Sequence, residues 1–459
     1  MAPKYHRPAA PVADQWPASI AHTNATADNV SELSWDEFFT DRKLQEVIRL
    51  ALAQNRDLRI AALNVDRARA LYGIQRSTLM PAVDASASAI HQRIPKDLSS
   101  SGHATTTDQY SVNLGVASWE IDLFGRLRSL KDRSLEEYFA TEHARRGAQI
   151  TLISSVAETY LALAADRENL ALAETTLATQ RDALALIQRR HDLGLATDLD
   201  LYRARTQVDS AAGEVARFTQ LTAQDLNALT LLVGGPVPDE LLPATLNTVG
   251  VPRDIRAGIP SEVLLQRPDV LQAESLLRAA NADVGAARAA FFPRISLTAA
   301  IGSASSDLSG LFKSGSGAWS YAPEIVMPIF DARTWSAHRA SKVQRDLAVA
   351  EYERAIQSAF REVADALAVR STVDAQTEAQ ASMVRSLEET YRLSQSRYEK
   401  GIDNYLSVLD AQRSLFAAQQ QLVRLDLSRV ASQVRLYAVL GGGSQVDASQ
   451  VRADLGKAR

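Results

Sequence analysis

Two stretches decide how this chain folds: RRHDLGLATDLDLYRARTQV at Arg189–Val208 and RYEKGIDNYLSVLDAQRSLF at Arg397–Phe416. Each has an arginine four positions before a glycine, a leucine five residues after the glycine, and an alanine five residues after the leucine. A helix that ends at a glycine and is followed by a second apolar-periodic segment is typical of a helical hairpin corner. The chain therefore contains the same corner twice, 207 residues apart (401 − 194).

The repetition extends beyond the two corners. Asp57–Pro81 aligns with Asp269–Pro293, and Glu158 aligns with Glu362 at an offset of 204 residues (362 − 158). Because these matches keep their order along nearly the whole chain, we interpret them as an internal duplication. Its period of about 207 residues is too long for a solenoid repeat.

Each half predicts moderate helices, two strands, a long helix and a return helix, in that order. Prolines end the moderate helices, since proline is disfavoured inside a helix. We expect these helices at Arg42–Thr78, broken near Asn55, and at Ser261–Ala290, interrupted at Pro268.

Period-two alternation follows each proline and predicts strands with one apolar and one polar face. The apolar positions are Val83, Ala85, Ala87 and Ala89, then Val112, Leu114 and Val116, and in the second half Ile295, Leu297, Ala299 and Ile301. Four such strands are too few to close a barrel, whereas alternating strands of about 9–11 residues suit a membrane barrel closed by several chains. A small soluble sheet is the alternative for the strands taken alone.

Long proline-free segments follow the strands. Residues 126–193 span 68 positions (193 − 126 + 1), about 100 Å as one helix, and 333–400 is the equivalent segment. Apolar residues spaced three and four apart predict coiled-coil seams. Return helices are expected at Asp198–Leu232 and Asp403–Leu440.

Composition narrows the possible functions. The 459-residue chain has a net charge of −4 and no cysteine. It has no basic stripe with interleaved aromatic residues, which argues against nucleic acid as a partner. No apolar run approaches the length of a transmembrane helix. No catalytic, metal-binding or cofactor-binding constellation is recognisable, so we expect neither an enzyme nor a cofactor.

Several segments, in this order, resemble the outer-membrane channels of tripartite efflux pumps, the TolC/NodT family, and especially its OprM-like lipoprotein branch. The matching segments are P-x-Y-x-R-P from Pro3 to Pro8, ALAQNRDLRIAALNV, WEIDLFGRLRSL, LLQRPDVLQAE, ARAAFFPRISLTA and RYEKGIDNYLSVLDAQRSLFAAQQQL. The resemblance implies a homotrimer in which 3 × 4 = 12 strands form an outer-membrane β-barrel above a 12-helix periplasmic tunnel. It also implies a passive exit duct for multidrug efflux.

The same resemblance implies partners and a location. The expected partners are a periplasmic adaptor protein, an inner-membrane pump of the resistance–nodulation–division type, and outer-membrane lipid. Branch members carry a lipidated cysteine just before the segment that matches MAPKYHRP, so we expect an anchoring cysteine upstream of Met1 in the native protein.

The resemblance also assigns segments. We expect an extended segment at 1–40, equatorial helices at 41–81 and 259–293, barrel hairpins at 82–120 and 294–330, periplasmic helical hairpins at 121–235 and 331–441, an equatorial linker at 236–258 and a tail at 442–459.

The second corner carries the candidate gate. Leu406, Asp410 and Arg413 share one helix face, and the matching first-copy residues are Leu199, Arg203 and Thr206. From the residues alone, Asp410 and Arg413 are a surface ion pair. The resemblance instead implies that Leu406 and Asp410 form rings at the closed periplasmic end of the tunnel, where a carboxylate ring favours cations.

The corner tips are the candidate docking site for the adaptor. The residues concerned are Asp192, Gly194, Lys400 and Gly401.

Two other functions stay open: the exit duct of a protein-secretion or other export system, and a coiled-coil scaffold without a pore. Only a channel needs the amphipathic strands.

Overall fold

The computed structural model describes residues 1–13, 16, 30, 32–255 and 261–443. The chain forms two compact units. The first contains residues 1–9, 63–142 and 272–354, and the second contains the remaining described residues. The predicted tail, 442–459, lies outside the described residues beyond position 443, and 256–258 of the predicted linker do so as well.

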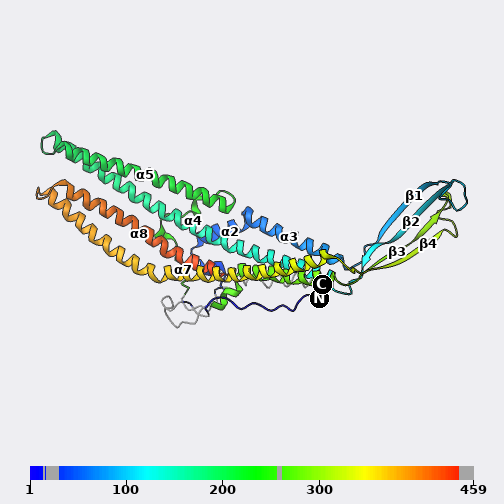
Figure 1. Ribbon diagram of the computed structural model, residues 1–459. Helices are drawn as coiled ribbons and strands as arrows, with labels where there is room; N and C mark the ends of the chain where they lie inside the picture. The colour runs from blue at the N-terminus through cyan, green and yellow to red at the C-terminus, as the bar shows by residue number, and fades with distance from the viewer. Residues whose placement is uncertain (14–15, 17–29, 31, 256–260, 444–459) are drawn as a thin grey trace. The chain divides into compact units, whose positions relative to one another are not determined.

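The first unit carries one four-stranded antiparallel sheet (Figure 1). Its strands are β1 (Asp84–Ile94), β2 (Thr105–Glu120), β3 (Arg294–Ser305) and β4 (Gly317–Val326), in the spatial order β1-β2-β3-β4. A short 3-10 turn, η4 (Leu308–Gly310), lies in the loop between β3 and β4. The strands of the two halves therefore join in one sheet, as the duplication predicts.

Two antiparallel helical hairpins dominate the second unit (Figure 1). The first pairs α4 (Arg126–Asp192) with α5 (Asp198–Val233), and the second pairs α7 (Ala332–Glu399) with α8 (Tyr405–Val439). The shorter elements of the chain are α1 (Trp35–Phe38), α2 (Arg42–Gln54), α3 (Arg56–Ser77), η1 (Asp239–Leu241), η2 (Leu246–Thr248), η3 (Ser261–Gln266) and α6 (Pro268–Ala289).

The predicted seams are the buried stripes of the long helices. Ile153, Ala157, Tyr160 and Ala164 of α4 are all at most 4% exposed, and α7 buries its own stripe in the same way. Small alanines in these stripes allow close approach of neighbouring helices. The helix α4 is apolar enough over part of its length to pass a composition test for a membrane span, but half of that stretch is buried inside the chain.

At each predicted helix break, a side chain binds the C-terminal end of a return helix. At the first break Asn55 donates 2.8 Å from Nδ2 to the Leu232 carbonyl at the end of α5. At the second, Arg267 donates 2.6 Å from Nη1 to the Val439 carbonyl at the end of α8, and also binds Glu362 of α7 at 2.7 Å. Since the last carbonyls of a helix lack partners within it, these side chains cap both return helices.

Several predicted boundaries need correction, most of them by one residue. The helix α4 ends at Asp192 rather than Leu193. The helix α8 begins at Tyr405 rather than Asp403, because Asn404 is its N-cap and accepts a hydrogen bond from the Ser407 amide. The strand β2 has 16 residues, more than the predicted 9–11. It is longer because its first part pairs with β1 and its last part with β3.

Candidate functional site

The two helical corners are built alike. In the first, Gly194 has φ 74° and its amide donates 2.8 Å to the His191 carbonyl, while the Leu195 amide reaches Arg190 at 2.7 Å. In the second, Gly401 has the same φ, and the equivalent bonds reach Tyr398 and Arg397, both at 2.9 Å. This pair of bonds is the Schellman motif, which needs a left-handed residue and so favours glycine. The predicted helix-ending glycines are confirmed.

The corners differ in the side chains that close them. In the first, Thr197 forms a reciprocal capping box with Asp200, and His191 contacts Asp198 at 2.9 Å. In the second, Arg397 forms a bidentate pair with Asp403 at 2.6 and 3.1 Å. The guanidinium keeps the pKa of Asp403 below its usual range by donating these hydrogen bonds. The second corner is therefore closed by an ion pair, whereas the first is closed by a capping box.

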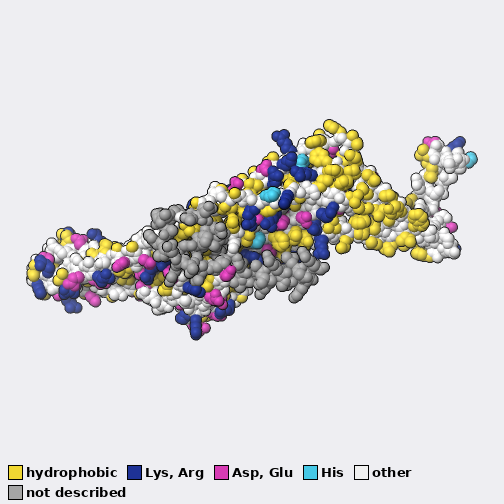
Figure 2. Space-filling model, turned by 90° about the horizontal axis from the view of Figure 1, so that it is seen from below, with side chains coloured by type: hydrophobic (Ala, Val, Ile, Leu, Met, Phe, Trp, Pro, Cys, Tyr) yellow, Lys and Arg dark blue, Asp and Glu magenta, His cyan; other side chains and the backbone are white. Residues whose placement is uncertain are grey.

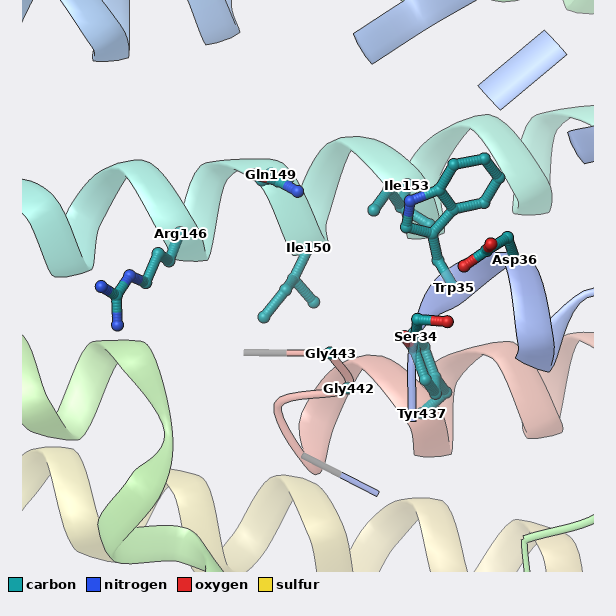
Figure 3. Close-up of a pocket in the computed structure, with 10 residues that line it drawn as sticks. All are labelled: Ser34, Trp35, Asp36, Arg146, Gln149, Ile150, Ile153, Tyr437, Gly442 and Gly443. Carbon is teal, nitrogen blue, oxygen red and sulfur yellow. The ribbon is translucent and has the colours of Figure 1, made fainter. Parts of the chain in front are cut away.

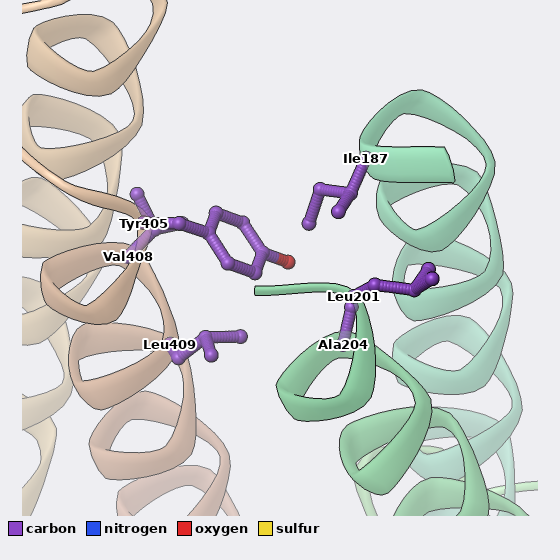
Figure 4. Packing of buried hydrophobic residues seen from close by; sticks show 6 residues of the cluster. All are labelled: Ile187, Leu201, Ala204, Tyr405, Val408 and Leu409. Atoms are coloured by element: carbon purple, nitrogen blue, oxygen red, sulfur yellow. The ribbon is translucent and has the colours of Figure 1, made fainter. Parts of the chain in front are cut away.

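A buried cluster joins the two corners within one chain (Figure 4). Tyr405 points from α8 toward the first hairpin, and its ring lies opposite Ile187. The members are Ile187 of α4, Leu201 and Ala204 of α5, and Tyr405, Val408 and Leu409 of α8. The cluster therefore holds the tip of one hairpin against the tip of the other by apolar packing.

Aromatic contacts extend this cluster. The rings of Tyr398 and Tyr405 lie 5.2 Å apart, and the Arg190 guanidinium of the first hairpin lies 5.0 Å from the Tyr398 ring centre. Burial raises the pKa of Tyr405 to about 12, so the hydroxyl stays neutral. A cation over an aromatic ring adds a direct attraction between the hairpins.

The predicted gate residues lie on a different face of α8 from this cluster. Leu406 is 38% exposed, and Asp410 and Arg413 are both exposed within the single chain. Arg413 Nη2 donates 3.3 Å to Asp410 Oδ1, which is the ion pair expected from the residues alone. The structure thus brings Asp410 and Arg413 together, and it leaves the side chain of Leu406 partly exposed within the single chain.

The first-copy equivalents have a different character. Leu199 is 57% exposed, and Arg203 is half-buried where Asp410 stands in the second copy. Thr206 donates its hydroxyl to the Tyr202 carbonyl at 2.9 Å. The two corners share a backbone but present opposite charges at one matching position.

The predicted docking residues lie at the ends of the hairpins. Asp192 is exposed and accepts a hydrogen bond from Gln188 Nε2 at 3.0 Å, and Lys400 is exposed as well. A Cβ added to Gly194 or Gly401 would meet no atom within 4 Å. The tips are therefore accessible within this chain.

The sheet forms a second functional surface, because its register separates apolar from polar side chains. One row across all four strands contains Ala85, Leu114, Ile301 and Trp319. The adjacent row, on the opposite face, contains Ser86, Asn113, Gly302 and Ala318. On the apolar face Leu114, Ile301 and Trp319 are 53%, 67% and 80% exposed, so the described part of the chain leaves this face uncovered.

The apolar face has limits along the strands. Toward the loops it ends at the cross-strand pair His91–Asp108, whose Nδ1 and Oδ1 lie 2.6 Å apart. Near α4 the polar face carries Glu120, which accepts bidentate hydrogen bonds from Arg126 at 2.8 and 2.6 Å. Figure 2 shows hydrophobic side chains gathered at the strand–helix junction and charged ones at the loop end.

A small cavity lies elsewhere, in the second unit (Figure 3). It has a volume of about 180 Å³ and lies between α1, α4 and the end of α8. Trp35 and Tyr437 line it, and the Tyr437 hydroxyl donates a hydrogen bond to the Leu33 carbonyl at 2.9 Å. None of the predicted site residues lines this cavity.

Sequence reasoning missed the cluster between the corners. The available signal was the pair Tyr398 and Tyr405, which flank Gly401 at distances of three and four residues. Their partners Ile187 and Arg190 lie about 200 residues earlier, and no local pattern connects them to the second corner.

Comparisons of sequence and of structure with known proteins point to one family along nearly the whole chain. The family model of the outer membrane efflux protein matches residues 47–235 and 259–442, once in each half. Two Pseudomonas putida proteins, the antibiotic efflux pump outer membrane protein ArpC and the toluene efflux pump outer membrane protein TtgC, are each 46% identical over 444 residues, covering 96% of this chain and 92% of theirs. The open-state crystal structure of the Neisseria gonorrhoeae MtrE outer membrane channel is 36% identical, with a TM-score of 0.87, and the match covers 97% of this chain and 98% of that one.

Proposed function

The chain belongs to the outer membrane efflux protein family, and we propose that three copies of it form one channel with a gate at the second-copy corners. It is an outer-membrane component of an efflux pump, with a transport role. The observation that carries the trimer is the sheet: β1 and β4 each pair on one side only, and one face is apolar and uncovered. Three such sheets supply twelve strands, and closure satisfies both open edges.

The apolar face of the sheet meets lipid and the polar face lines the lumen. Between Tyr110 and Trp119 the apolar face runs for about 27 Å along β2, which at the usual strand tilt gives a band of roughly 20 Å. The pair His91–Asp108, the next row on this face, then marks the outer edge of the band, because ionisable side chains are costly in hydrocarbon.

Leu406 and Asp410 form the gate, with Arg413 holding Asp410. The corner cluster fixes the rotation of α8, so that Leu406, Asp410 and Arg413 face away from the first hairpin of their own chain. In a trimer three leucines form a dry constriction and three carboxylates form a ring that favours cations. The first-copy corner, with Arg203 in place of the aspartate, serves as the fixed wall.

The tips around Asp192, Gly194, Lys400 and Gly401 bind a periplasmic adaptor, and the adaptor connects the channel to an inner-membrane pump of the resistance–nodulation–division type. The matched relatives are named for antibiotic and toluene efflux, which favours small organic compounds over secreted proteins as cargo. We expect charge reversal at Asp192 or Lys400 to weaken cross-linking to the adaptor while trimers stay intact.

Single cysteines test the barrel directly, because the chain has none of its own. We expect Thr298→Cys, on the polar face, to react with a membrane-impermeant maleimide in proteoliposomes. Ile301→Cys, on the apolar face, should react at least tenfold more slowly and should recover after solubilisation in denaturant. Equal labelling of the two positions in intact proteoliposomes would reject the membrane barrel and leave the scaffold alternative.

A further inference from the structure

The first seven residues of the chain, which we call the N-terminal strap, lie against α6 in the first unit. The backbone nitrogen of Ala2 lies 2.6 Å from the position that a Cβ on Gly285 would occupy. One turn further along α6, Asn281 donates 2.9 Å from Nδ2 to the Pro3 carbonyl. The glycine therefore lets the strap approach the helix backbone, and the asparagine fixes its register.

The strap ends in a buried clamp around Glu274. The Tyr5 hydroxyl donates to Oε1 at 3.1 Å, and Arg7 donates to both carboxylate oxygens at 3.0 and 2.5 Å. Arg278, one turn along α6, donates to Oε1 at 2.7 Å and places its guanidinium 5.0 Å from the Tyr5 ring centre. The Glu274 side chain is only 3% exposed.

The spacing of these contacts matches an extended chain lying antiparallel to a helix. Ala2 to Arg7 is five residues (7 − 2), or about 16 Å in a polyproline-like conformation. Gly285 to Glu274 is eleven residues (285 − 274), which rise about 16 Å in a helix. Each helical turn of α6 in this interval therefore contributes one contact to the strap.

Electrostatics explains why a carboxylate can be buried here. Burial alone raises the pKa of Glu274, but the hydrogen bonds from Arg7 and Arg278 outweigh it and leave the pKa below its usual range. Burial and the nearby carboxylate raise the pKa of Tyr5 to about 12, so its hydroxyl remains a donor. Removal of the carboxylate charge would leave two arginines without their shared acceptor.

The duplicated helix α3 shows that the strap is specific to the second copy. Gly73 aligns with Gly285, but a Cβ on Gly73 would meet no atom within 4 Å. Ala62 stands at the position that matches Glu274. The helix α3 accordingly exposes apolar side chains, namely Ile60, Leu63, Leu71 and Ile74, each at least 50% exposed.

We infer that the strap is a fixed structural part of this channel, held in place by Glu274. It covers one face of α6, whereas the equivalent helix α3 keeps its apolar side chains exposed. The strap also holds the backbone nitrogen of Met1 3.7 Å from the position of a Cβ on Gly125, at the turn from β2 into α4. Its placement at the membrane boundary rests on the proposed barrel, whereas the fastening itself does not.

A nitroxide on Lys4→Cys reports strap mobility, because Lys4 is exposed and the chain has no other cysteine. In detergent-purified trimers of the parent we expect an immobilised spectrum. Glu274→Gln should shorten the rotational correlation time of the label at least fivefold. In unlabelled protein that keeps Lys4, the same substitution should speed tryptic cleavage after Lys4 at least tenfold. The matched control is Glu136→Gln, an isosteric change near Arg278 and Glu274, which should leave both measurements at the parent values.

Arg7→Ala gives an independent reading if Glu274→Gln lowers the yield of folded protein, since the Arg7 side chain is 45% exposed. It should mobilise the label as well. A label that is mobile in the parent, or immobile in both variants, would overturn the inference. Conductance of the same samples separates the two proposals: a conducting channel with a mobile strap rejects only the strap, and an immobile strap on a protein that never conducts rejects only the channel.

Discussion

At the residue scale, the helical hairpins contain a carboxylate pair that lowers stability at neutral pH. Asp225 of α5 lies beside Asp166 of α4, and burial together with the neighbouring carboxyl group raises the pKa of Asp225 to about 6. Because the folded state holds this proton more tightly than the unfolded state, the contribution of Asp225 to stability is fully present below about pH 4 and is lost as the pH rises to about 6. Ionised Asp225 then remains a cost above that pH.

Asp225→Asn should therefore stabilise the protein at pH 7.5 and not at pH 4. The full pKa shift corresponds to roughly 3 kcal/mol, and solvent screening reduces the expected gain to about 1 kcal/mol. The measurement is the thermal midpoint of purified trimers at both pH values. Asp209→Asn, an exposed change on the same helix, is the control. An equal gain at both pH values would contradict the carboxylate-pair explanation.

Tyr405 offers a test of the cluster between the corners. Its hydroxyl is buried without a hydrogen-bond partner in the described part of the chain, while its ring fills the space between the hairpins. Tyr405→Phe should thus be neutral or slightly stabilising, whereas Tyr405→Ala should cost about 3–5 kcal/mol of local packing.

The expected readout is tryptic cleavage at Arg397 and Lys400, next to the cluster. Cleavage should be at least tenfold faster in Tyr405→Ala and unchanged in Tyr405→Phe. Similar rates in the two variants would show that the ring does not hold the hairpin tips together.

At the element scale, the helices were predictable and the sheet register was not. Helix periodicity and glycine signals are local, so the long helices and both corners follow from the sequence within one or two residues. The register depends on which residues face each other across strands that are far apart in the sequence, as Leu114 and Ile301 are, 187 residues apart (301 − 114). An irregularity between Val116 and Trp119 also shifts the strand pairing there, and no residue type in this segment predicts it.

The candidate site divides in the same way. Leu406, Asp410 and Arg413 follow a helical spacing, so their common face could be predicted from the sequence. The Glu274 clamp could not, because its donors Tyr5 and Arg7 lie about 270 residues away. The two segments match one family separately, and no pattern in the sequence connects them.

Gly302 makes a prediction for the sheet. A Cβ on Gly302 would overlap the Val112 carbonyl oxygen of β2. Gly302→Ala should therefore force β2 and β3 apart locally and reduce the yield of folded trimers at least severalfold. The control is Gly317→Ala in β4, where an added Cβ meets nothing within 4 Å. Heat-resistant trimers on gels provide the measurement, and equal yields from the two variants would contradict the register.

At the scale of the whole molecule, duplication supplies two hairpins whose corners have diverged in sequence. Both corners use the same Schellman turn, but Asp410 is present in only one, and Arg203 occupies the matching position in the other. The helices α3 and α6 show a second divergence, since only α6 is covered by the strap. We propose that the second-copy corner closes the channel while the first-copy corner does not move.

Conductance and reversal potential in planar bilayers test this claim most directly, with four variants compared under a salt gradient. We expect the wild-type channel to conduct weakly and prefer cations. Asp410→Ala should raise conductance at least severalfold and reduce the cation preference, because it removes the ring charge and the contact with Arg413. Leu406→Ala should raise conductance with little change in selectivity, while Arg203→Ala and Leu199→Ala should change each property less. Equal effects from both corners, or no effect from Asp410→Ala and Leu406→Ala, would contradict the account.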